Sequence, residues 1–426
     1  METLDVIVVG GGYAGLSCAY YLQQQGYNVK LFEASPFIGG RAKSEKINGF
    51  ILDRGTHYYH HSTTELKKII NLKDLQLKNL YPGYLLRYED SFYVYTNPLY
   101  KTIDTFSTAI AKNANLKDKL RMFSLFVKLK ATPYNVLVKE KDTSTYEFLK
   151  KSGFSQQTIN TLFRPMMAAN IFDWNLQSSS KIAKLYLKSL FADQIALPKD
   201  GIGSIAEAIS KQLNPASICI KSKIKQVTED GVIFENGNFL KAKAVVIATN
   251  TLSANKLYPT KSLTVESTHV STIYFESNQA PISKPIVLLN GEGKGIVNHI
   301  FIPTLLHSNY APSGKHLIAV NIVKPHDFDD DELVTKVQVE LANWFGLQVQ
   351  DWNHIKTYHI KYAMPFQPIL DKVEFVKPLA YNVFFAGDGI AVGTMESALR
   401  SGRETAQHIH QNVLSKQKSR REEAVY

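Results

Sequence analysis

The sequence predicts an α/β protein in which a Rossmann-like, dinucleotide-binding domain is interrupted by insertions that form a second, α+β domain. The first observation behind this class is the start of the chain, where a β-like run, a glycine-rich turn, a helical pattern and another β-like run follow in the order of a βαβ unit. The second is the middle of the chain, which is first mainly helical and then rich in strands. The third is the end of the chain, where one more strand and one more helix are predicted, as expected if they complete the interrupted first domain.

Each element is predicted from its local pattern. The opening strands span 5–9 and 28–33, with a helix over 13–25 between them. Asn48-Gly49 and Glu89-Asp90 each predict a hairpin turn, within 43–54 and within 84–95. From 103 to 192, apolar residues recur at the spacings of a helix. The remaining elements are a helix from 203 to about 213, strands at 217–227, 232–235, 243–248, 265–275, 296–302 and 316–323, a helix at 329–345, a strand at 382–386 and a helix at 394–413.

These elements divide the chain into a discontinuous first domain and an inserted second domain. We expect the Rossmann-like domain to comprise 1–80, 200–262 and 378–415, the substrate domain to comprise 81–199 and 263–377, and a basic tail to follow at 416–426.

Composition excludes several classes of protein. Of the 426 residues, 44% are hydrophobic and 20% are charged, which disagrees with a disordered or fibrous chain. No apolar run approaches the roughly 18 residues of a membrane span. The two cysteines, Cys18 and Cys219, give no disulfide framework, and the start of the chain has no basic leader, so we expect a cytoplasmic protein. Part of the net charge of +11 lies in the tail, and we expect no nucleic-acid partner.

The first motif that carries chemistry is Gly10-x-Gly12-x-x-Gly15, which follows a β run and opens a helix. Gly10 permits the tight turn, Gly12 lets a pyrophosphate approach the backbone, and Gly15 lets helix and strand pack closely. Glu33 ends the second strand, where a carboxylate can bind the ribose hydroxyls of an adenosine. The motif predicts a dinucleotide site but does not distinguish NAD from FAD.

The segment after Glu33 makes that distinction. It begins at Ala34 and reads ASPFIGGRAKS, which places Gly39-Gly40-Arg41 shortly after the ribose acid. This segment resembles the second glycine pair of the flavin amine oxidase superfamily, whose branches include amine oxidases, protoporphyrinogen oxidases and carotenoid desaturases. The resemblance implies that these residues lie along the pyrophosphate and flavin of FAD, where the guanidinium offsets phosphate charge.

The C-terminal run FAGDGIAVGTMESALRSGR, residues 385–403, resembles the closing flavin signature of the same superfamily. The resemblance implies that Gly387-Asp388 contacts the ribityl chain and that amides at Gly393, Thr394 and Met395 face the N1–C2=O edge of the flavin. A helix N-terminus there would stabilise the negative charge of reduced flavin. Ser397 departs from the superfamily, which usually has glycine at this position.

Weaker matches extend the resemblance over nearly the whole chain. Residues 199–208 resemble a glycine-led helix of the superfamily, Ile224 falls at an apolar position that packs on adenine, and 163–180 resembles a helical segment of protoporphyrinogen oxidases and desaturases. Thr56 and His57 lie where the superfamily brings a loop past the flavin. No carboxylate or cysteine at ligand spacing joins the nearby histidines, so we expect no metal.

Features of the middle and end of the chain favour one branch. The strand equivalent to the one that carries a flavin-facing lysine in amine oxidases, 269–275, has no lysine, and 361–365, KYAMP, resembles protoporphyrinogen oxidases and desaturases. No cysteine lies within 380–400, so the resemblance implies non-covalent FAD.

The preferred interpretation is hydride removal from a C–H bond of an apolar small-molecule substrate, with no catalytic side chain assigned. The alternatives are a flavin amine oxidase, a flavin-dependent isomerase, and a non-enzymatic protein similar to GDP-dissociation inhibitors.

One predicted helix has an unusual surface. In 116–130, Leu116, Leu120, Phe123 and Val127 recur at helical spacing, and the basic residues Lys117, Arg121 and Lys128 form a narrow polar stripe. Two interpretations stay open: the helix packs on its neighbours while its lysines reach solvent, or the helix rests on an anionic membrane surface beside the substrate entrance.

Overall fold

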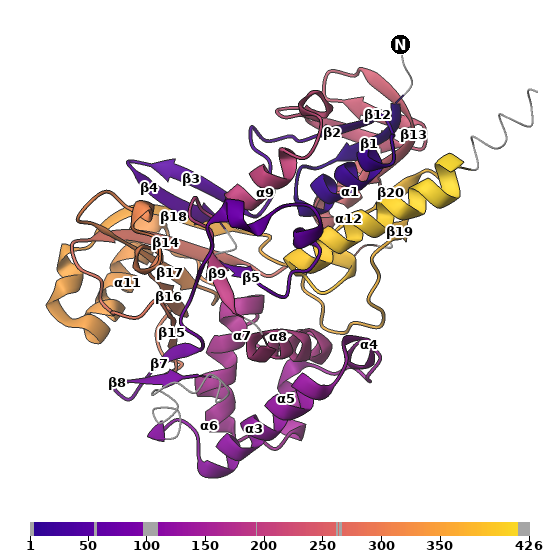
Figure 1. Cartoon of the computed structure of the whole chain (residues 1–426). Coiled ribbons are helices and arrows are strands. Elements are labelled where there is room, and N and C mark those ends of the chain that lie inside the picture. Colours follow the sequence, from indigo (N-terminus) through magenta and orange to yellow (C-terminus); the bar gives the residue numbers. More distant parts are fainter. Residues whose placement is uncertain are drawn as a thin grey trace, which may run out of the picture.

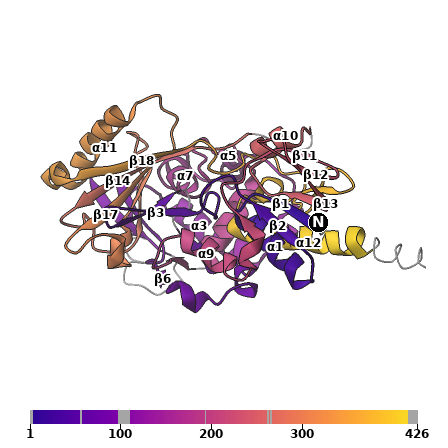
Figure 2. The same cartoon turned by 90° about the horizontal axis from the view of Figure 1, so that it is seen from above.

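The computed structural model describes residues 4–54, 58–96, 110–192, 194–260, 263 and 266–415. Figures 1 and 2 show that these residues form two sheets and a group of helices. The sheet that contains β1 lies beside α1 and α12, the sheet that contains β14 lies beside α11, and the helices from α3 to α8 lie together at the bottom of Figure 1, next to β7 and β8.

The first sheet joins strands from the start, the middle and the end of the chain. Five strands run parallel in the order β10 (Ile218–Cys219), β2 (Val29–Phe32), β1 (Leu4–Val9), β13 (Phe239–Ile247) and β20 (Val383–Phe385). The first half of β13 pairs antiparallel with β12 (Gly231–Phe234), which pairs with β11 (Ile224–Thr228), and β19 (Lys377–Pro378) pairs with β20. The parallel part is buried on both faces, as its run of apolar residues requires.

Alternation along β1 directs its side chains to two separate cores. Val6 and Val8 pack with α1 (Tyr13–Gln24), α9 (Gly203–Ser210) and α12 (Met395–Ile409), whereas Ile7 and Val9 pack on the other face, where α10 (Thr251–Leu257) lies.

Helices α1 and α12 make a close backbone contact. A Cβ on Gly402 would lie 2.2 Å from the carbonyl oxygen of Ala14, and Ser17 Oγ donates a hydrogen bond to the carbonyl oxygen of Leu399 at 2.7 Å. The last helix is thereby fixed against the first helix of the chain.

The second sheet has the order β18 (Asn353–Ile360), β14 (Val270–Ser277), β17 (His316–Ile322), β16 (His299–Phe301), β15 (Val287–Asn290), β7 (Tyr84–Tyr88) and β8 (Ser91–Tyr95). Its neighbours are antiparallel except β15 and β7. On β14, Ile273 packs on the side of α11 (Asp330–Phe345), and Tyr274 packs on the side of the helices.

The remaining elements connect these parts. The helices are α3 (Leu116–Ala131), α4 (Tyr134–Leu137), α5 (Thr145–Lys151), α6 (Gln156–Thr158), a π-helical turn (Ile159–Phe163), α7 (Arg164–Ile171) and α8 (Ser180–Ala192). A second π-helical turn, His410–Leu414, continues α12. Short strands form the pair β3 (Lys43–Ile47) and β4 (Phe50–Arg54) and the sheet β5 (Tyr59–His60), β9 (Ile195–Leu197) and β6 (Lys78–Asn79). Single 3₁₀ turns lie at Leu66–Lys68, Leu72–Leu75, Pro215–Ser217, Pro303–Leu305, Ser308–Tyr310, Gly346–Asp351 and Asp388–Ile390.

The predicted fold class and both predicted hairpins are confirmed. Asn48 and Gly49 have φ of 48° and 83°, and Glu89 and Asp90 have φ of 49° and 56°, which is the left-handed conformation that two-residue hairpin turns require. The strand predicted at 265–275 begins only at Val270, because the residues before it leave the sheet. Thr268 there exchanges hydrogen bonds with Ala363 and Met364 instead.

Several elements were not predicted. They are helix α10, strand β18 and the short strands β15, β5, β6, β9 and β19. Within the described ranges, no helix combines the length and the apolar character that crossing a bilayer requires.

Candidate functional site

The three glycines of the first motif have different surroundings. Gly10 has a φ of +114°, and a Cβ there would lie 2.6 Å from the carbonyl oxygen of Ala248; a Cβ on Gly15, in the first turn of α1, would lie 1.9 Å from the carbonyl oxygen of Gly10. A Cβ on Gly12 would meet no heavy atom of the described residues within 4 Å, and Gly12 caps α1 without a side-chain hydrogen bond. A phosphate can therefore approach Gly12 and the first amides of α1.

The carboxylate of Glu33 holds this turn at the end of β2. Its Oε2 accepts a hydrogen bond from the amide of Gly11 at 2.8 Å, and its Oε1 accepts one from the amide of Ser35 at 2.8 Å. Each carboxylate oxygen has a second lone pair, so Glu33 can still accept a hydrogen bond from a ribose hydroxyl. Ala34 beside it is exposed.

The second glycine pair packs directly on the first glycine turn. The amide of Gly39 donates to the carbonyl oxygen of Gly11 at 2.8 Å, and a Cβ on Gly40 would lie 3.3 Å from Gly12 Cα. Both residues have positive φ, +106° and +61°, which favours glycine. The two predicted cofactor motifs near the start of the chain are thus one continuous surface.

Arg41 joins this surface to the end of the chain. Its Nη2 lies 2.6 Å from both carboxylate oxygens of Asp388, and its Nη1 donates to the carbonyl oxygen of Ala363 at 2.9 Å. Burial acts to lower the pKa of Arg41, but the charge and hydrogen bond of Asp388 outweigh this effect and raise it. The ion pair is half-buried, with 34% of the Arg41 side chain and 11% of the Asp388 side chain exposed.

The start of α12 is fixed by its own cap. Thr394 Oγ1 accepts a hydrogen bond from the amide of Ser397 at 3.1 Å and donates one to the Ser397 hydroxyl at 3.0 Å. Ser397, which departs from the superfamily, therefore supports the cap of the helix that begins at Met395. Upstream, the amide of Gly387 donates to Ser401 Oγ at 2.9 Å, which attaches the Gly-Asp turn to α12.

The loop after β18 reaches the same place. A Cβ on Gly393, whose φ is +67°, would lie 2.7 Å from Met364 Cε. Three residues further, Gln367 Nε2 donates to the carbonyl oxygen of Gly389 at 3.4 Å, and Gln367 Oε1 is buried without a hydrogen-bond partner among the residues that the structure describes. A buried acceptor of this kind fits an N–H donor of a ligand at the closing motif.

The other predicted contact residues have different outcomes. Thr56 and His57 lie outside the described residues. Ile224 is 5% exposed and belongs to the same apolar core as Phe32, so its contact with an adenine stays a prediction.

Asp53, on β4, is a buried carboxylate beside these motifs. It accepts hydrogen bonds from Ser44 Oγ at 2.6 Å and from the amide of Ile202 at 2.9 Å, which joins β3, β4 and the start of α9. Burial raises the pKa of Asp53 to about 7, and these hydrogen bonds only partly oppose that effect.

We expect Asp53 to make stability depend on pH. Its pKa is about 7 in the folded chain and about 3.9 in an unfolded chain, so the folded state binds the proton more tightly. The contribution of this proton to folding is complete below about pH 4 and is lost as the pH rises through about 7. Asp53→Asn lacks this proton, so its free energy of unfolding relative to wild type should rise by roughly 2–4 kcal/mol across that range. Urea unfolding at several pH values measures this difference, and a difference independent of pH would contradict the account.

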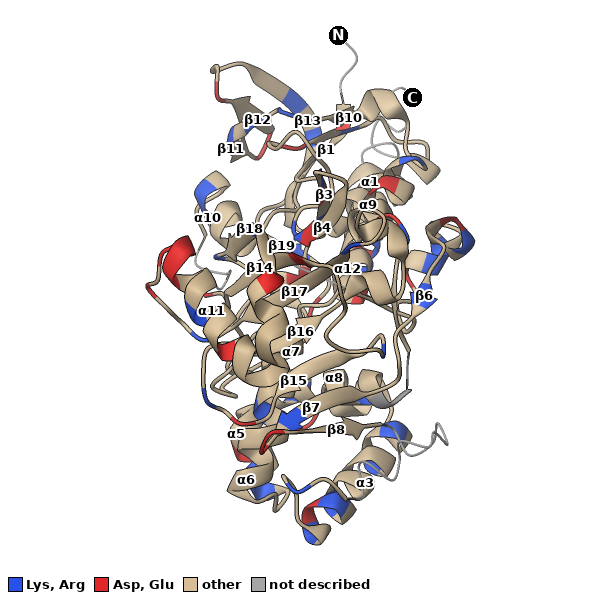
Figure 3. Ribbon diagram, turned by 90° about the vertical axis from the view of Figure 1, so that its left-hand side faces the viewer, with Lys and Arg blue, Asp and Glu red and all other residues tan. Residues whose placement is uncertain are grey.

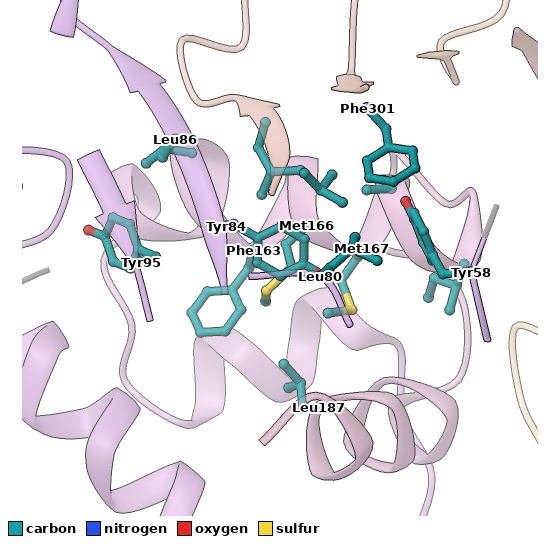
Figure 4. Packing of buried hydrophobic residues seen from close by; sticks show 14 of the residues in the cluster. Tyr58, Leu80, Tyr84, Leu86, Tyr95, Phe163, Met166, Met167, Leu187 and Phe301 are labelled. Atoms are coloured by element: carbon teal, nitrogen blue, oxygen red, sulfur yellow. The ribbon is translucent and has the colours of Figure 1, made fainter. Parts of the chain in front are cut away.

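Apolar side chains of the sheet and of the helices meet beside the closing motif. Figure 4 shows this apolar cluster, which includes Tyr58, Leu80, Tyr84, Phe163, Met166, Met167, Leu187 and Phe301. Val392 of the closing motif belongs to the same cluster, and Met364 packs against it. Burial raises the pKa of Tyr84 to about 12, so its hydroxyl is neutral at pH 7. This hydroxyl lies 3.1 Å from the hydroxyl of Tyr186 and forms a hydrogen bond with it.

Charged groups next to this cluster have partners within the protein. Lys181 Nζ donates to the carbonyl oxygen of Leu370 at 2.7 Å, and Lys184 forms an ion pair with Glu140 at 2.7 Å. Asp173 accepts a hydrogen bond from the amide of Ser178 at 2.6 Å. These groups therefore stabilise the fold and leave the cluster apolar.

Comparison with known proteins agrees with this geometry. A family model described as "Flavin containing amine oxidoreductase" matches residues 13–410. The chain belongs to this family. It is therefore a flavin-containing oxidoreductase, and this membership favours an enzyme over the alternative similar to GDP-dissociation inhibitors.

Relatives within the family are distant. Coproporphyrinogen III oxidase of Bacillus subtilis is 21% identical over 91% of this chain and 94% of its own length. Protoporphyrinogen oxidase 2 of Arabidopsis thaliana is 27% identical over 38% of this chain, and the match spans 31% of that protein. Among solved structures, an oxidoreductase from Methanosarcina mazei has a TM-score of 0.71 at 15% identity, covering 95% of this chain and 100% of that one. Putrescine oxidase bound to putrescine also has a TM-score of 0.71, at 16% identity, covering 96% of this chain and 99% of that one. These structures establish the fold.

Sequence reasoning missed two features of the site. The Arg41–Asp388 ion pair joins residues 347 positions apart, and each was predicted to contact the cofactor rather than the other. Gln367 was not predicted at all; its place directly after the KYAMP segment was the available signal.

Proposed function

We propose that the chain binds FAD non-covalently on the joined glycine motifs and uses it to remove a hydride from a C–H bond of an apolar substrate. The open space at Gly12 and the amides of α1 fit the pyrophosphate, and Glu33 fits the adenosine ribose. Asp388, held by Arg41, fits the ribityl chain, and Gln367 Oε1 offers a buried acceptor. The free cysteines, Cys18 and Cys219, lie in α1 and β10, which supports non-covalent binding.

The apolar cluster is the observation that carries the substrate class. It extends from α7 and α8 to Val392 in the closing motif; of the lysines beside it, Lys181 bonds to a backbone carbonyl oxygen and Lys184 pairs with Glu140. An amine or amino-acid substrate needs a charged or polar partner when it is desolvated, whereas an apolar one does not. When bound, the isoalloxazine supplies the hydride acceptor; the chain's own residues bind the substrate, orient it and keep it dry.

Anaerobic reduction of the purified flavoprotein tests this function. Porphyrinogens, polyenes and polyamines are added separately while the flavin absorbance is followed. We expect bleaching by a porphyrinogen or a polyene and none by a polyamine. Bleaching by a polyamine alone would overturn the proposal in favour of an amine oxidase, and conversion of a polyene without net reduction would overturn it in favour of an isomerase.

Replacement of Glu33 is expected to weaken FAD binding. Glu33→Ala removes a charge-assisted hydrogen bond to the ribose and should reduce the binding free energy by roughly 1.5–3 kcal/mol. Titration of the apoprotein with FAD measures this loss. Asp5→Ala is the matched control, because Asp5 also accepts a backbone hydrogen bond, from Asn28 at 2.9 Å, but lies near the opposite end of β1. Equal affinities of Glu33→Ala and wild type would show that Glu33 serves the turn alone.

A further inference from the structure

Helix α3 is apolar on two faces. Its inner face, with Leu125, Phe126 and Leu129, is buried. Its outer face carries Leu116, Leu120, Phe123 and Val127, whose exposed fractions are 73%, 63%, 51% and 47%. The helix therefore packs on its neighbours through its inner face, while these four side chains stay exposed.

Further apolar side chains close to α3 in the sequence are also exposed. Ile110, Tyr134 and Val136 are 54%, 37% and 46% exposed. Together with the four residues of α3, they make seven of the sixteen large apolar side chains that stand exposed in the described part of the chain. Exposed apolar side chains are thus concentrated in the segment 110–136, and the four of α3 form one stripe, which marks an interaction site rather than ordinary scatter.

Basic residues border the outer stripe, defined as Leu116, Leu120, Phe123 and Val127, on both sides. Lys117 and Lys128 each follow a stripe residue by one position and lie along one edge, and Lys130, seven positions after Phe123, lies along the other edge. In the described ranges, no carboxylate forms an ion pair with these three lysines. Figure 3 shows α3 with its basic positions at the far end of the molecule from β1.

The acidic residue of this helix points inward. Asp118 is fully buried and accepts hydrogen bonds from Thr158 at 2.8 Å and from the amide of Ser155 at 3.2 Å. Arg121 is its ion-pair partner at 3.2 Å, so this arginine belongs to the anchor of the helix rather than to its outer surface. The outer face is thus apolar at its centre and positively charged at its edges.

The helix does not need its outer stripe to stay in place. Asp118 and the inner face attach it to the neighbouring helices, and Lys188 Nζ donates to the carbonyl oxygens of Leu129 and Lys130, both at 2.9 Å. Substitutions in the stripe should therefore leave the fold intact.

We propose that α3 rests on the surface of an anionic lipid bilayer. A narrow apolar stripe between two basic edges fits the boundary between acyl chains and headgroups, because the stripe can enter the acyl region while the lysines reach lipid phosphates. The charge pattern favours this occupant over a second copy of the chain, since two identical faces would bring their basic edges together. Leu125 and Leu129, on the inner face of α3, belong to the apolar cluster of the candidate site. A bilayer that contacts the outer face of α3 is therefore separated from this cluster by one helix.

Co-sedimentation with vesicles tests the proposal. The full-length, flavin-loaded protein is mixed at low and at high salt with vesicles of phosphatidylcholine, and with vesicles of phosphatidylcholine and phosphatidylglycerol in equal parts. We expect binding to the anionic vesicles at low salt, and weaker binding at high salt and to the neutral vesicles. Each basic residue at the leaflet contributes about fivefold to the partition coefficient, so Lys117→Gln/Lys128→Gln/Lys130→Gln should lower it by roughly a hundredfold.

The stripe itself is tested by Leu120→Ser/Phe123→Ser, which should lower the partition coefficient by at least about tenfold. Val339→Ser/Leu347→Ser is the matched control, because Val339 and Leu347 are also exposed, 63% and 78%, but lie in and beside α11. Wild type that stays in the supernatant with anionic vesicles at low salt overturns the proposal. The proposal is also overturned if the control variant loses as much of the partition coefficient as Leu120→Ser/Phe123→Ser, or if the protein forms a dimer in solution that Leu120→Ser/Phe123→Ser abolishes. These outcomes are independent of the flavin absorbance, so they do not depend on the proposed function.

Discussion

Gly12→Val is expected to fold like wild type and to purify without flavin, whereas Gly15→Val is expected to lose both fold and flavin. A Cβ at Gly12 would meet no heavy atom of the described residues within 4 Å, and the extended backbone there, with φ of −78° and ψ of −179°, accepts valine. The same side chain fills the space through which a pyrophosphate reaches the amides of α1. We expect FAD affinity to fall by roughly a hundredfold or more, about 3 kcal/mol.

Gly15→Val differs because its Cβ would lie 1.9 Å from the carbonyl oxygen of Gly10. The backbone must move, and the expected loss of stability is about 3 kcal/mol or more. Flavin absorbance per chain and urea unfolding, measured on both variants, separate the two effects. A Gly12→Val protein that stays fully yellow would show that the cofactor does not pass over Gly12.

The second large effect concerns the Arg41–Asp388 ion pair. Asp388→Ala removes the partner of a guanidinium that is only 34% exposed and, by the proposed function, a contact to the ribityl chain. We expect flavin to be lost and the free energy of unfolding to fall by about 1–3 kcal/mol. Arg41→Met should produce a loss of similar size, because it leaves the carboxylate, 11% exposed, without its cation.

A double-mutant cycle distinguishes the pair from two independent contacts. Arg41→Met, Asp388→Asn and the double variant should give a coupling energy of about 1–3 kcal/mol in urea unfolding. The exposed pair Lys151–Glu147, whose side chains are 67% and 46% exposed at 3.6 Å, is the control and should give about 0.5 kcal/mol or less. Coupling at Arg41–Asp388 no greater than at the control would mean that the two ends of the chain are not joined through this pair.

Elements that depend on residues close together in the sequence were predictable. The β run at 5–9, the turn Asn48-Gly49 and the helix predicted at 394–413 each depend on residues close together in the sequence, and the structure has the corresponding elements. The glycines of the first motif were predictable for the same reason, since Gly10 and Gly15 meet each other within one turn.

Features that depend on distant contacts were not predictable. Nothing near Arg41 in the sequence indicates that its partner is Asp388, and the KYAMP segment before Gln367 does not indicate that the amide of this residue bonds to Gly389. The surface of α3 has the same cause: its sequence is apolar on two faces, and only packing decides that the face with Leu125 is buried while the face with Leu120 is exposed.

Release of the flavin on denaturation shows whether the site assembled from both ends of the chain holds FAD without a covalent bond. The purified protein is denatured and precipitated, and the flavin in the supernatant and in the pellet is identified and counted per chain. We expect about one FAD per chain, all of it in the supernatant. A colourless protein that takes up no added FAD, or flavin that stays in the pellet, would contradict the account.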